Sequence, residues 1–233
     1  MGKNLIQQAR GKGSPTYRAP SFKYKAKVSY PQRASFGKII DFIKCRGHSS
    51  PLAKIQYDSG EETYVIAAEG MRTGDTVNIG SVEPKNGNTL HLKDIPIGAA
   101  LFNIEGRPGD GGKFVRSSGC FARLLSKKDN DVVIMLPSKK EKTFHAECRA
   151  TVGMIAGAGR KEKPFLTAGR KYHYMKARNK LWPKVSGQSM NAVDHPFGTS
   201  RSSKKGQPTI ADKNAPPGAK VGKIRPRRTG MKR

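Results

Sequence analysis

The chain has 233 residues, which is enough for one large or two small domains. It carries 45 Lys and Arg residues against 17 Asp and Glu residues, and its net charge is +28. A protein that binds a neutral metabolite does not need so large an excess of positive charge. The composition therefore indicates a polyanionic partner, either a nucleic acid or an acidic membrane surface.

The positive charge is concentrated at the two ends. Residues 1–38 hold nine Lys and Arg residues and no acid, and residues 196–233 hold eleven and a single acid. The ends carry +9 and +10, whereas the much longer middle, residues 39–195, carries only +9. Like charges at this density repel one another, so we expect that neither end folds alone. The pattern predicts two basic arms that flank an ordinary folded region.

Apolar runs and cysteines narrow the class of protein further. The longest apolar runs are comparable to VVIML, far short of the ~20 residues that span a bilayer. We expect no secretory signal, because no apolar segment stands near the first residue. The cysteines, Cys45, Cys120 and Cys148, are odd in number and widely spaced, which is typical of a reduced cytosolic protein.

Short segments rich in β-branched and aromatic residues predict two groups of strands. The turn sequences DSGEE, EPKNGN, KDND and SKKE separate them, and the Pro- and Gly-rich residues 95–112 divide the groups. Strands spaced in this way are typical of small barrels, so we predict an all-β fold with two barrels in tandem. The predicted strands are residues 36–45, 52–58, 63–68, 75–80 and 89–94, then 120–127, 131–137 and 142–148.

Residues 168–182 predict a short helix in which aromatic and basic side chains alternate. Aromatic rings can stack on unpaired bases and cations can neutralise phosphates. A solvated helix whose tyrosines cover the second barrel explains the same pattern about equally well. The charged ends of the chain favour the nucleic-acid interpretation. The cations in question include Arg170, Lys171, Arg178 and Lys180.

Two glycine-rich segments fail the tests for nucleotide binding. In GRPGDGGKF (106–114) the lysine comes one residue too late for a phosphate loop, and no hydroxyl residue follows it. GMIAGAGRKEK (153–163) has no third glycine in register. The first segment can still bring its backbone close to a phosphate.

Two pairs of possible zinc ligands, Cys45 with His48 and His145 with Cys148, favour a structural explanation. A three-residue offset on a strand places two side chains on opposite faces, so we expect one core cysteine and one exposed histidine in each pair.

The segment SGQSMNAVDHPFG (186–198) contains an adjacent acid and base, Asp194 and His195. A hydrolase or transferase that uses His195 is one hypothesis. The segment lacks the second glycine of a nucleophile elbow, however, and an acid beside a histidine in sequence cannot easily orient its ring. The sequence favours a contact role for this loop.

Three segments, GRPGDGGKFVRSSG, ECRATVG and SMNAVDHPFG, strongly resemble the ribosomal protein L2 family of the large ribosomal subunit, in its archaeal and eukaryotic branch. The resemblance covers nearly the whole chain. It implies an OB-like barrel followed by an SH3-like barrel, with extended basic N- and C-terminal arms. The expected division is an N-terminal arm (1–35), an OB-like barrel (36–94), an SH3-like barrel (95–165) and a basic C-terminal extension (166–233).

The resemblance implies a structural protein that binds ribosomal RNA and is not an enzyme. In that family the chemistry belongs to RNA, and the protein supports assembly of the peptidyl transferase region and subunit association in translation. The implied partners are large-subunit ribosomal RNA and neighbouring ribosomal proteins, in the cytoplasm. No membrane, small-molecule substrate, cofactor or metal is expected. A general architectural DNA-binding protein remains a further alternative.

The family motifs point to particular RNA contacts. They match Arg116 in FVRSSG, Arg149 in CRATVG, and Met190, Asn191, Asp194 and His195 in the loop. The sequence departs from the family at Ala192, where Pro is frequent, and at Thr199 and Ser200, where glycines are frequent. With the cations of residues 168–182, the predicted contacts also include Arg201, Lys204, Lys205, Arg225, Arg227 and Arg228.

Overall fold

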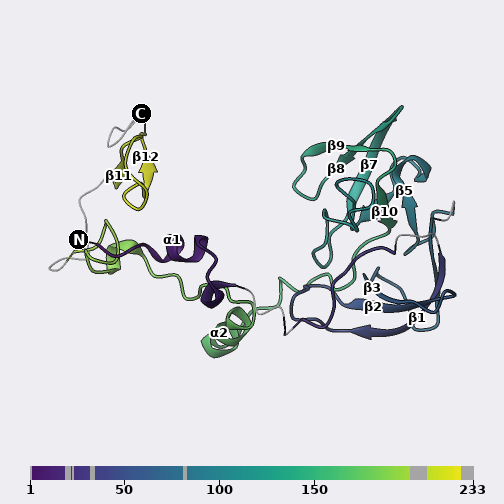
Figure 1. Cartoon of the computed structure of the whole chain (residues 1–233), viewed down its shortest axis with the longest axis horizontal. Helices are drawn as coiled ribbons and strands as arrows, with labels where there is room; N and C mark the ends of the chain where they lie inside the picture. Colours follow the sequence, from purple (N-terminus) through teal and green to yellow (C-terminus); the bar gives the residue numbers. More distant parts are fainter. Residues whose placement is uncertain are drawn as a thin grey trace. The chain divides into compact units, whose positions relative to one another are not determined.

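The computed structural model describes residues 2–18, 22, 24–31, 35–80, 83–199 and 209–226. The chain divides into two compact units, which we call the β unit (residues 21–166) and the arm unit (residues 1–20 together with 167–233). In Figure 1 the strands β1 to β10 belong to the β unit, and the two labelled α-helices belong to the arm unit.

The first barrel of the β unit consists of β1 (Ser35–Ile43), β2 (Leu52–Tyr57), β3 (Glu62–Ile66) and β4 (Thr76–Ile79). Strand β1 lies between β2 and β4 and pairs antiparallel with both. Alternate side chains of each strand point to the same side, where they form one core. The core contains Ile39, Ala53, Ile55, Tyr57, Val65, Ala67, Val77 and Ile79.

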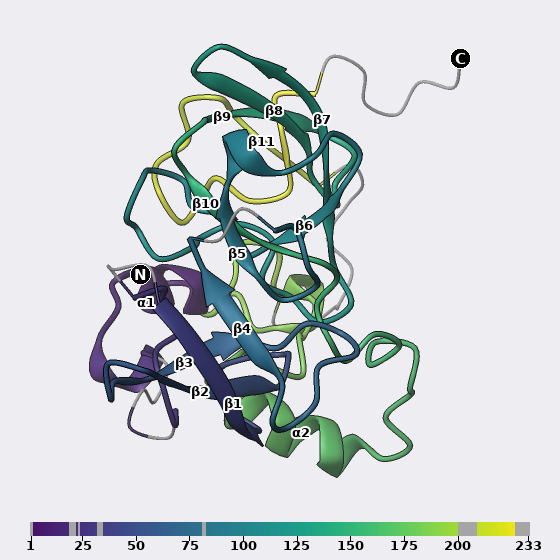
Figure 2. The ribbon, with the colours of Figure 1, turned by 90° about the vertical axis from the view of Figure 1, so that its right-hand side faces the viewer.

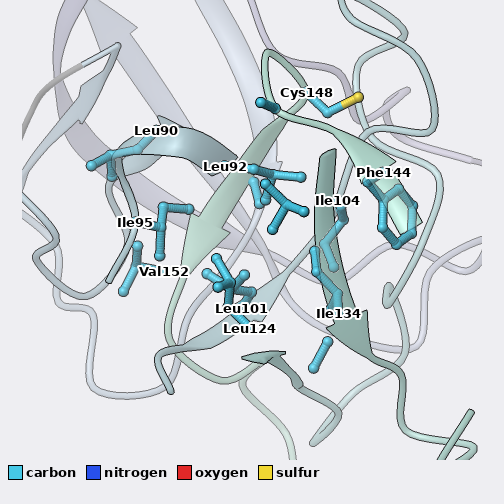
Figure 3. Packing of buried hydrophobic residues seen from close by; sticks show 14 residues of the cluster. Leu90, Leu92, Ile95, Leu101, Ile104, Leu124, Ile134, Phe144, Cys148 and Val152 are labelled. Atoms are coloured by element: carbon cyan, nitrogen blue, oxygen red, sulfur yellow. The ribbon is translucent and has the colours of Figure 1, made fainter. Parts of the chain in front are cut away.

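The second barrel consists of β5 (Thr89–His91), β6 (Ala100–Phe102), β7 (Ala122–Lys128), β8 (Asp131–Met135), β9 (Glu141–His145) and β10 (Arg149–Val152). Strands β7, β8 and β9 form an antiparallel meander. Figure 3 shows Leu92, Leu101 and Leu124 gathered in the middle of the buried cluster. All three side chains are fully buried, so this cluster is the core of the second barrel.

One continuous sheet connects the two barrels, in the order β3-β2-β1-β4-β5-β10-β6-β7-β8-β9. The connection is a short parallel contact between β4 and β5, at Ile79 and Thr89, and Figure 2 shows both strands at the passage from one barrel to the other. A third apolar cluster, which includes Leu52, Phe102 and Ile155, joins elements of both barrels. The predicted all-β fold with an OB-like and an SH3-like barrel is confirmed.

The eight predicted strand segments each overlap an observed strand. Sequence patterns do not indicate β6, which lies within the Pro- and Gly-rich residues 95–112, or β10, which follows the predicted strand 142–148 without a turn sequence between them. Both strands owe their conformation to pairing: β10 lies between β5 and β6 in the sheet. The division of the chain at residues 35, 94 and 165 stays a prediction.

Residues 24–31, which precede the boundary predicted at residue 35, pack into the β unit. Val28 and Tyr30 are buried, and Val28 belongs to the cluster that joins the barrels. The phenolic hydroxyl of Tyr30 donates to the carbonyl oxygen of Asn103 over 2.8 Å and lies 2.6 Å from Oγ1 of Thr151. Basic composition concealed this segment, since its lysines alternate with the side chains that are buried.

The arm unit brings together the two ends of the sequence. It contains α1 (Ile6–Gly11), α2 (Ala168–Lys176) and a two-stranded parallel pair, β11 (Ile210–Ala211) with β12 (Lys223–Ile224). Short 3-10 helices cover Pro15–Tyr17 and Gly187–Ser189. Within the described part of the chain, no helix combines the length and apolar character that crossing a bilayer requires.

Two deletions test the role of residues 24–31. Removing residues 1–34 should destabilise the β unit, because the loss of Val28 and Tyr30 removes two buried side chains worth on the order of 1.5–3 kcal/mol each. Removing only residues 1–20 should leave the β unit unchanged. Hydrogen exchange of β6 and β10, followed by mass spectrometry, measures the difference. Equal protection in the two variants would contradict the assignment of this segment to the core.

Candidate nucleic-acid interface

The histidine loop (residues 190–198) lies in the arm unit and is closed by its own backbone. The amides of Asp194 and His195 donate to the carbonyl oxygen of Asn191 over 3.0 and 3.2 Å. The amide of Gly198 donates to the carbonyl oxygen of His195 over 2.8 Å. These bonds close two consecutive turns, so the loop has a defined shape that does not depend on a partner.

The imidazole of His195 is held by its neighbours. The amide of Phe197 donates to Nδ1 over 3.0 Å, and the two rings meet edge to face with their centroids 5.1 Å apart. A methyl group at Gly187 would overlap the imidazole, so this close approach requires glycine. Because Nδ1 accepts a hydrogen bond, the neutral ring carries its proton on Nε2. His195 therefore offers a hydrogen-bond donor at Nε2 and no basic lone pair there.

The carboxylate of Asp194 faces the N-terminal arm. Its Oδ1 lies 3.6 Å from Nζ of Lys3, and the amide of Lys3 donates to the carbonyl oxygen of Val193 over 2.8 Å. The ion pair is largely exposed and contributes little on its own, because water screens it. The backbone bond nevertheless places the beginning of the chain beside the histidine loop.

Asn179 makes a second connection between the ends of the sequence. Its side-chain Nδ2 donates to the carbonyl oxygens of Thr16 and Arg18 over 2.8 and 2.6 Å. The Nη2 group of Arg10 donates to the carbonyl oxygen of Asn179 over 2.5 Å. Asn179 has a φ of 49°, a left-handed conformation that asparagine adopts more readily than most residues. Two segments of like charge are thus joined by polar bonds between them.

The predicted helix is confirmed as α2, which ends at Lys176 and not at residue 182. The guanidinium of Arg178 lies 3.8 Å from the ring centroid of Tyr174, and Nζ of Lys171 lies 5.5 Å from that of Trp182. These cation–π contacts place rings and cations side by side on one segment. Of the four cations predicted here, Arg170 and Lys180 are exposed and Lys171 and Arg178 are half-buried.

The glycine-rich loop 106–112 turns its amides inward, so its backbone does not offer them to a phosphate. The carboxylates of Glu105 and Asp110 accept hydrogen bonds from five of these amides, at 3.0 to 3.3 Å. In phosphate-binding loops, consecutive backbone amides form a concave surface that binds an anion. Here the two carboxylates take the place that a phosphate would have in such a loop. The donors are Gly106, Arg107, Gly109, Gly111 and Gly112.

Arg149, predicted as an RNA contact, lies in a buried ion pair of the β unit. Its Nη2 lies 2.9 Å from Oε1 of Glu105, its Nε donates to the same oxygen over 3.2 Å, and its backbone amide donates to Oε2 over 2.8 Å. Glu105 is fully buried and the Arg149 side chain is only 11% exposed. Nη1 donates to the carbonyl oxygen of Pro31 over 2.7 Å, and the guanidinium lies 5.3 Å from the ring centroid of Tyr30.

Burial shifts the pKa values of two groups near this pair. It raises the pKa of Tyr30 well above its usual value, because the phenolate would lose its hydration. It lowers the pKa of Arg116, whose Nη1 donates to the carbonyl oxygen of Gly112 over 2.9 Å. The guanidinium of Arg116 is half-buried, so part of it remains accessible at the rim of the glycine-rich loop.

The remaining predicted contacts lie in the arm unit. In the histidine loop Met190 is half-buried and Asn191 is exposed. The backbone amide of Arg225 donates to the carbonyl oxygen of Ala211 over 2.9 Å, beside the strand pair β11–β12. Five further predicted contacts lie outside the described residues: Arg201, Lys204, Lys205, Arg227 and Arg228.

The pair of His145 and Cys148 is distributed as its spacing predicts, whereas in the pair of Cys45 and His48 the histidine is not exposed as expected. Cys45 and Cys148 are buried, His145 is exposed and His48 is half-buried. Burial raises the pKa of Cys148 to about 11, as expected for the thiol of a core cysteine. Across the described ranges, no three His, Cys, Asp or Glu side chains meet in a way that could hold a metal ion.

Sequence patterns did not indicate the groups that position these sites. Glu105, Tyr30, Lys3 and Asn179 were not predicted to have any role. For Glu105 one signal was present, a single acid within the apolar context LFNIEG. A buried acid requires a partner, so that context could have pointed to an internal ion pair.

Replacing Glu105 tests the buried pair. Glu105→Gln should lower the free energy of unfolding by about 3–5 kcal/mol, because it leaves the Arg149 guanidinium buried without a counter-charge. Glu62→Gln is a matched control, since Glu62 pairs with Lys54 at 2.7 Å on the exposed side of the first barrel and should matter little. Urea unfolding measures both variants. Equal stability of the two would show that the buried pair does not support the fold.

Comparisons with known proteins cover the whole chain. The family described as "Ribosomal Proteins L2, RNA binding N-terminal domain" matches residues 6–79, and "Ribosomal Proteins L2, C-terminal domain" matches residues 85–217. Similar proteins named large ribosomal subunit protein uL2 occur in Archaeoglobus fulgidus and Methanocaldococcus jannaschii. Each is 48% identical, over 100% of both chains. The uL2 protein of Haloquadratum walsbyi is 48% identical over 99% of this chain and 97% of its own. The chain therefore belongs to the ribosomal protein L2 family.

Proposed function

We propose that this chain is a structural component of the large ribosomal subunit that binds ribosomal RNA in the cytoplasm. The proposal rests on one observation: some basic side chains are neutralised inside the protein, whereas most of those in the arms are not. Arg149 neutralises an internal carboxylate, whereas the arms hold most of the excess charge without internal acids to match it. Charge that the protein does not neutralise itself is available to phosphates. Membership in the family supports the same assignment.

The proposed contacts fall into two groups. Cations neutralise phosphates, and they are Arg170, Lys171, Arg178, Lys180, Arg201, Lys204, Lys205, Arg225, Arg227 and Arg228. The histidine loop makes shaped contacts through Met190, Asn191, Asp194 and His195. Arg116 contacts RNA from the rim of the glycine-rich loop. Arg149 acts indirectly, by holding that loop and residues 30–31 in place.

This function includes support for the assembly of the peptidyl transferase region and for subunit association. A loop that is closed by its own backbone can enter folded RNA at little cost in conformational entropy. The arms can neutralise phosphates that would otherwise repel one another. Neighbouring ribosomal proteins are the other proposed partners, and no membrane, cofactor or small-molecule substrate takes part.

We also propose that His195 is not a general base. A general base needs a lone pair directed at the proton that it removes. The Phe197 amide occupies Nδ1, and the neighbouring carboxylate of Asp194 faces Lys3. In the orientation that the loop gives the ring, Nε2–H can donate a hydrogen bond to an RNA oxygen.

Salt dependence tests the role of the C-terminal residues. Deleting residues 207–233 removes eight cations, and each lost phosphate contact should reduce the slope of log affinity against log salt by about 0.7–0.9. We expect the slope for ribosomal RNA to fall by several units. Filter binding at a series of salt concentrations measures it, with duplex DNA as competitor to detect general DNA binding. An unchanged slope would mean that this arm does not contact the RNA.

Substitution of His195 separates contact from catalysis. His195→Gln keeps a donor but cannot titrate near neutral pH, so reconstituted subunits should form peptide bonds within about tenfold of the normal rate, or ~1.4 kcal/mol in the barrier. Pro196→Gly should instead impair assembly, because it frees the backbone before the proline. Incorporation into subunits and single-turnover peptide transfer are measured separately. Fully assembled His195→Gln subunits that make no peptide bonds would restore the catalytic hypothesis.

A further inference from the structure

A cavity of about 630 Å³ lies in the β unit, away from the loops discussed above. Strands β1 and β4 and the segment before β5 form its walls. Its volume falls within the range of sites for small ligands. The side chains on which the argument depends are Phe36, Asp75, Asn78, Glu83 and Lys85.

Phe36 provides an aromatic surface at this cavity. It lies on β1 and is 61% exposed, while Gly37 and Ile39 of the same strand are buried. In the register of the sheet Phe36 stands opposite Asn78 of β4, so both side chains occupy the outer face of the barrel. An exposed ring beside an amide is the combination that stacks on a base and reads its edge.

The charged groups of the cavity exclude a phosphate. Asp75 and Glu83 are acids, and Lys85, the one lysine among the described lining residues, is paired with Glu83 at 2.7 Å. A phosphate would be repelled here, although the chain as a whole attracts RNA. Among the parts of a nucleic acid, the one that this cavity suits is therefore the uncharged, flat base.

The same acids select among the bases. A carboxylate only accepts hydrogen bonds. One oxygen of Asp75 accepts from the amide of Arg72 over 2.7 Å, and Asp75 is exposed, so it has further capacity to accept. Guanine presents two adjacent N–H donors on its Watson–Crick edge, N1–H and the N2 amino group, which match a carboxylate. The side chain of Asn78 makes no hydrogen bond to the described residues and can supply a donor to O6.

We propose that this cavity binds one unpaired guanine base of RNA, stacked on Phe36 with its Watson–Crick edge toward Asp75. The proposal rests on the proposed RNA-binding function and assigns a specific base site to it. Lys38, exposed two residues along β1, lies on the same face and neutralises a phosphate of the bound strand. The arms supply affinity for any RNA, and this cavity supplies a preference among sequences.

The test uses the full-length protein and three single-stranded RNA pentamers, UUGUU, UUAUU and UUUUU. Fluorescence anisotropy at several salt concentrations gives both the affinity and its salt dependence. Phe36→Ala should weaken binding of UUGUU by about 5- to 150-fold, the range for loss of one stacked base. Phe36→Tyr should retain binding within about threefold, because the ring remains. Phe165→Ala is the matched control: it removes an exposed ring of the same unit that does not line the cavity, and it should have no effect.

Asp75→Asn should reduce the preference for UUGUU over UUAUU by about tenfold or more, because a bidentate contact is lost. Phe36→Ala should leave the salt slope unchanged, since no phosphate contact is removed. If the unaltered protein bound ribosomal RNA without salt dependence, the proposed function would fail. If its salt slope were normal but Phe36→Ala resembled Phe165→Ala, only the base site would be overturned. Equal affinity for UUGUU and UUAUU would overturn the assignment to guanine.

Discussion

The buried pair of Glu105 and Arg149 is the interaction on which the β unit depends. Glu105 enters the interior with its charge, which is costly unless hydrogen bonds replace the lost water. Three N–H groups of Arg149 and two loop amides supply those bonds. The free nitrogen of the guanidinium reaches Pro31. One charge pair thus joins three segments that are distant in sequence: the entry to the first barrel, the glycine-rich loop and β10.

The same pair explains why a glycine-rich loop in so basic a protein does not bind phosphate. Consecutive amides at left-handed glycines form a concave donor surface, and anions fit it. Here the anions are the protein's own carboxylates, Glu105 and Asp110. The acids satisfy the buried amides of Gly111 and Gly112, which would otherwise be unpaired, and the loop becomes rigid. A rigid loop keeps Arg116, for which an RNA contact is proposed, at a fixed position on the rim.

In the arm unit, too, hydrogen bonds and ion pairs hold together segments that are distant in sequence, and here both segments are highly charged. Segments that repel each other do not collapse through apolar burial, so specific polar bonds must join them. The carbonyl oxygen of Asn179 accepts a hydrogen bond from Arg10, and its side chain donates to two carbonyl oxygens of the N-terminal arm. Lys3 forms an ion pair with Asp194 of the histidine loop. The two ends of the chain therefore form one surface together. In it, the N-terminal arm contacts the histidine loop, which belongs to the C-terminal extension. Its remaining cations are available to a polyanion.

The sequence by itself determined the composition of the surface and the positions of the longer strands. Short segments rich in β-branched and aromatic residues, separated by turn sequences, identified eight strands, because such side chains favour extended backbone. Net charge indicated the class of partner, and short motifs indicated the family. Strands β6 and β10 were not predicted, since pairing with distant strands, and not a local run of β-branched or aromatic residues, makes them extended.

Only the tertiary structure decided which cations are internal. Arg149 and Arg170 are the same residue type, yet the side chain of Arg149 is only 11% exposed whereas Arg170 is exposed. The difference lies in partners that are 44 residues away at Glu105 and 118 residues away at Pro31. The tautomer of His195 was likewise decided by an amide donor that a turn brings to Nδ1. Hydrogen bonds and ion pairs depend on distances in space. For residues that are far apart in the sequence, those distances are set by the folded structure and cannot be read from the order of the residues.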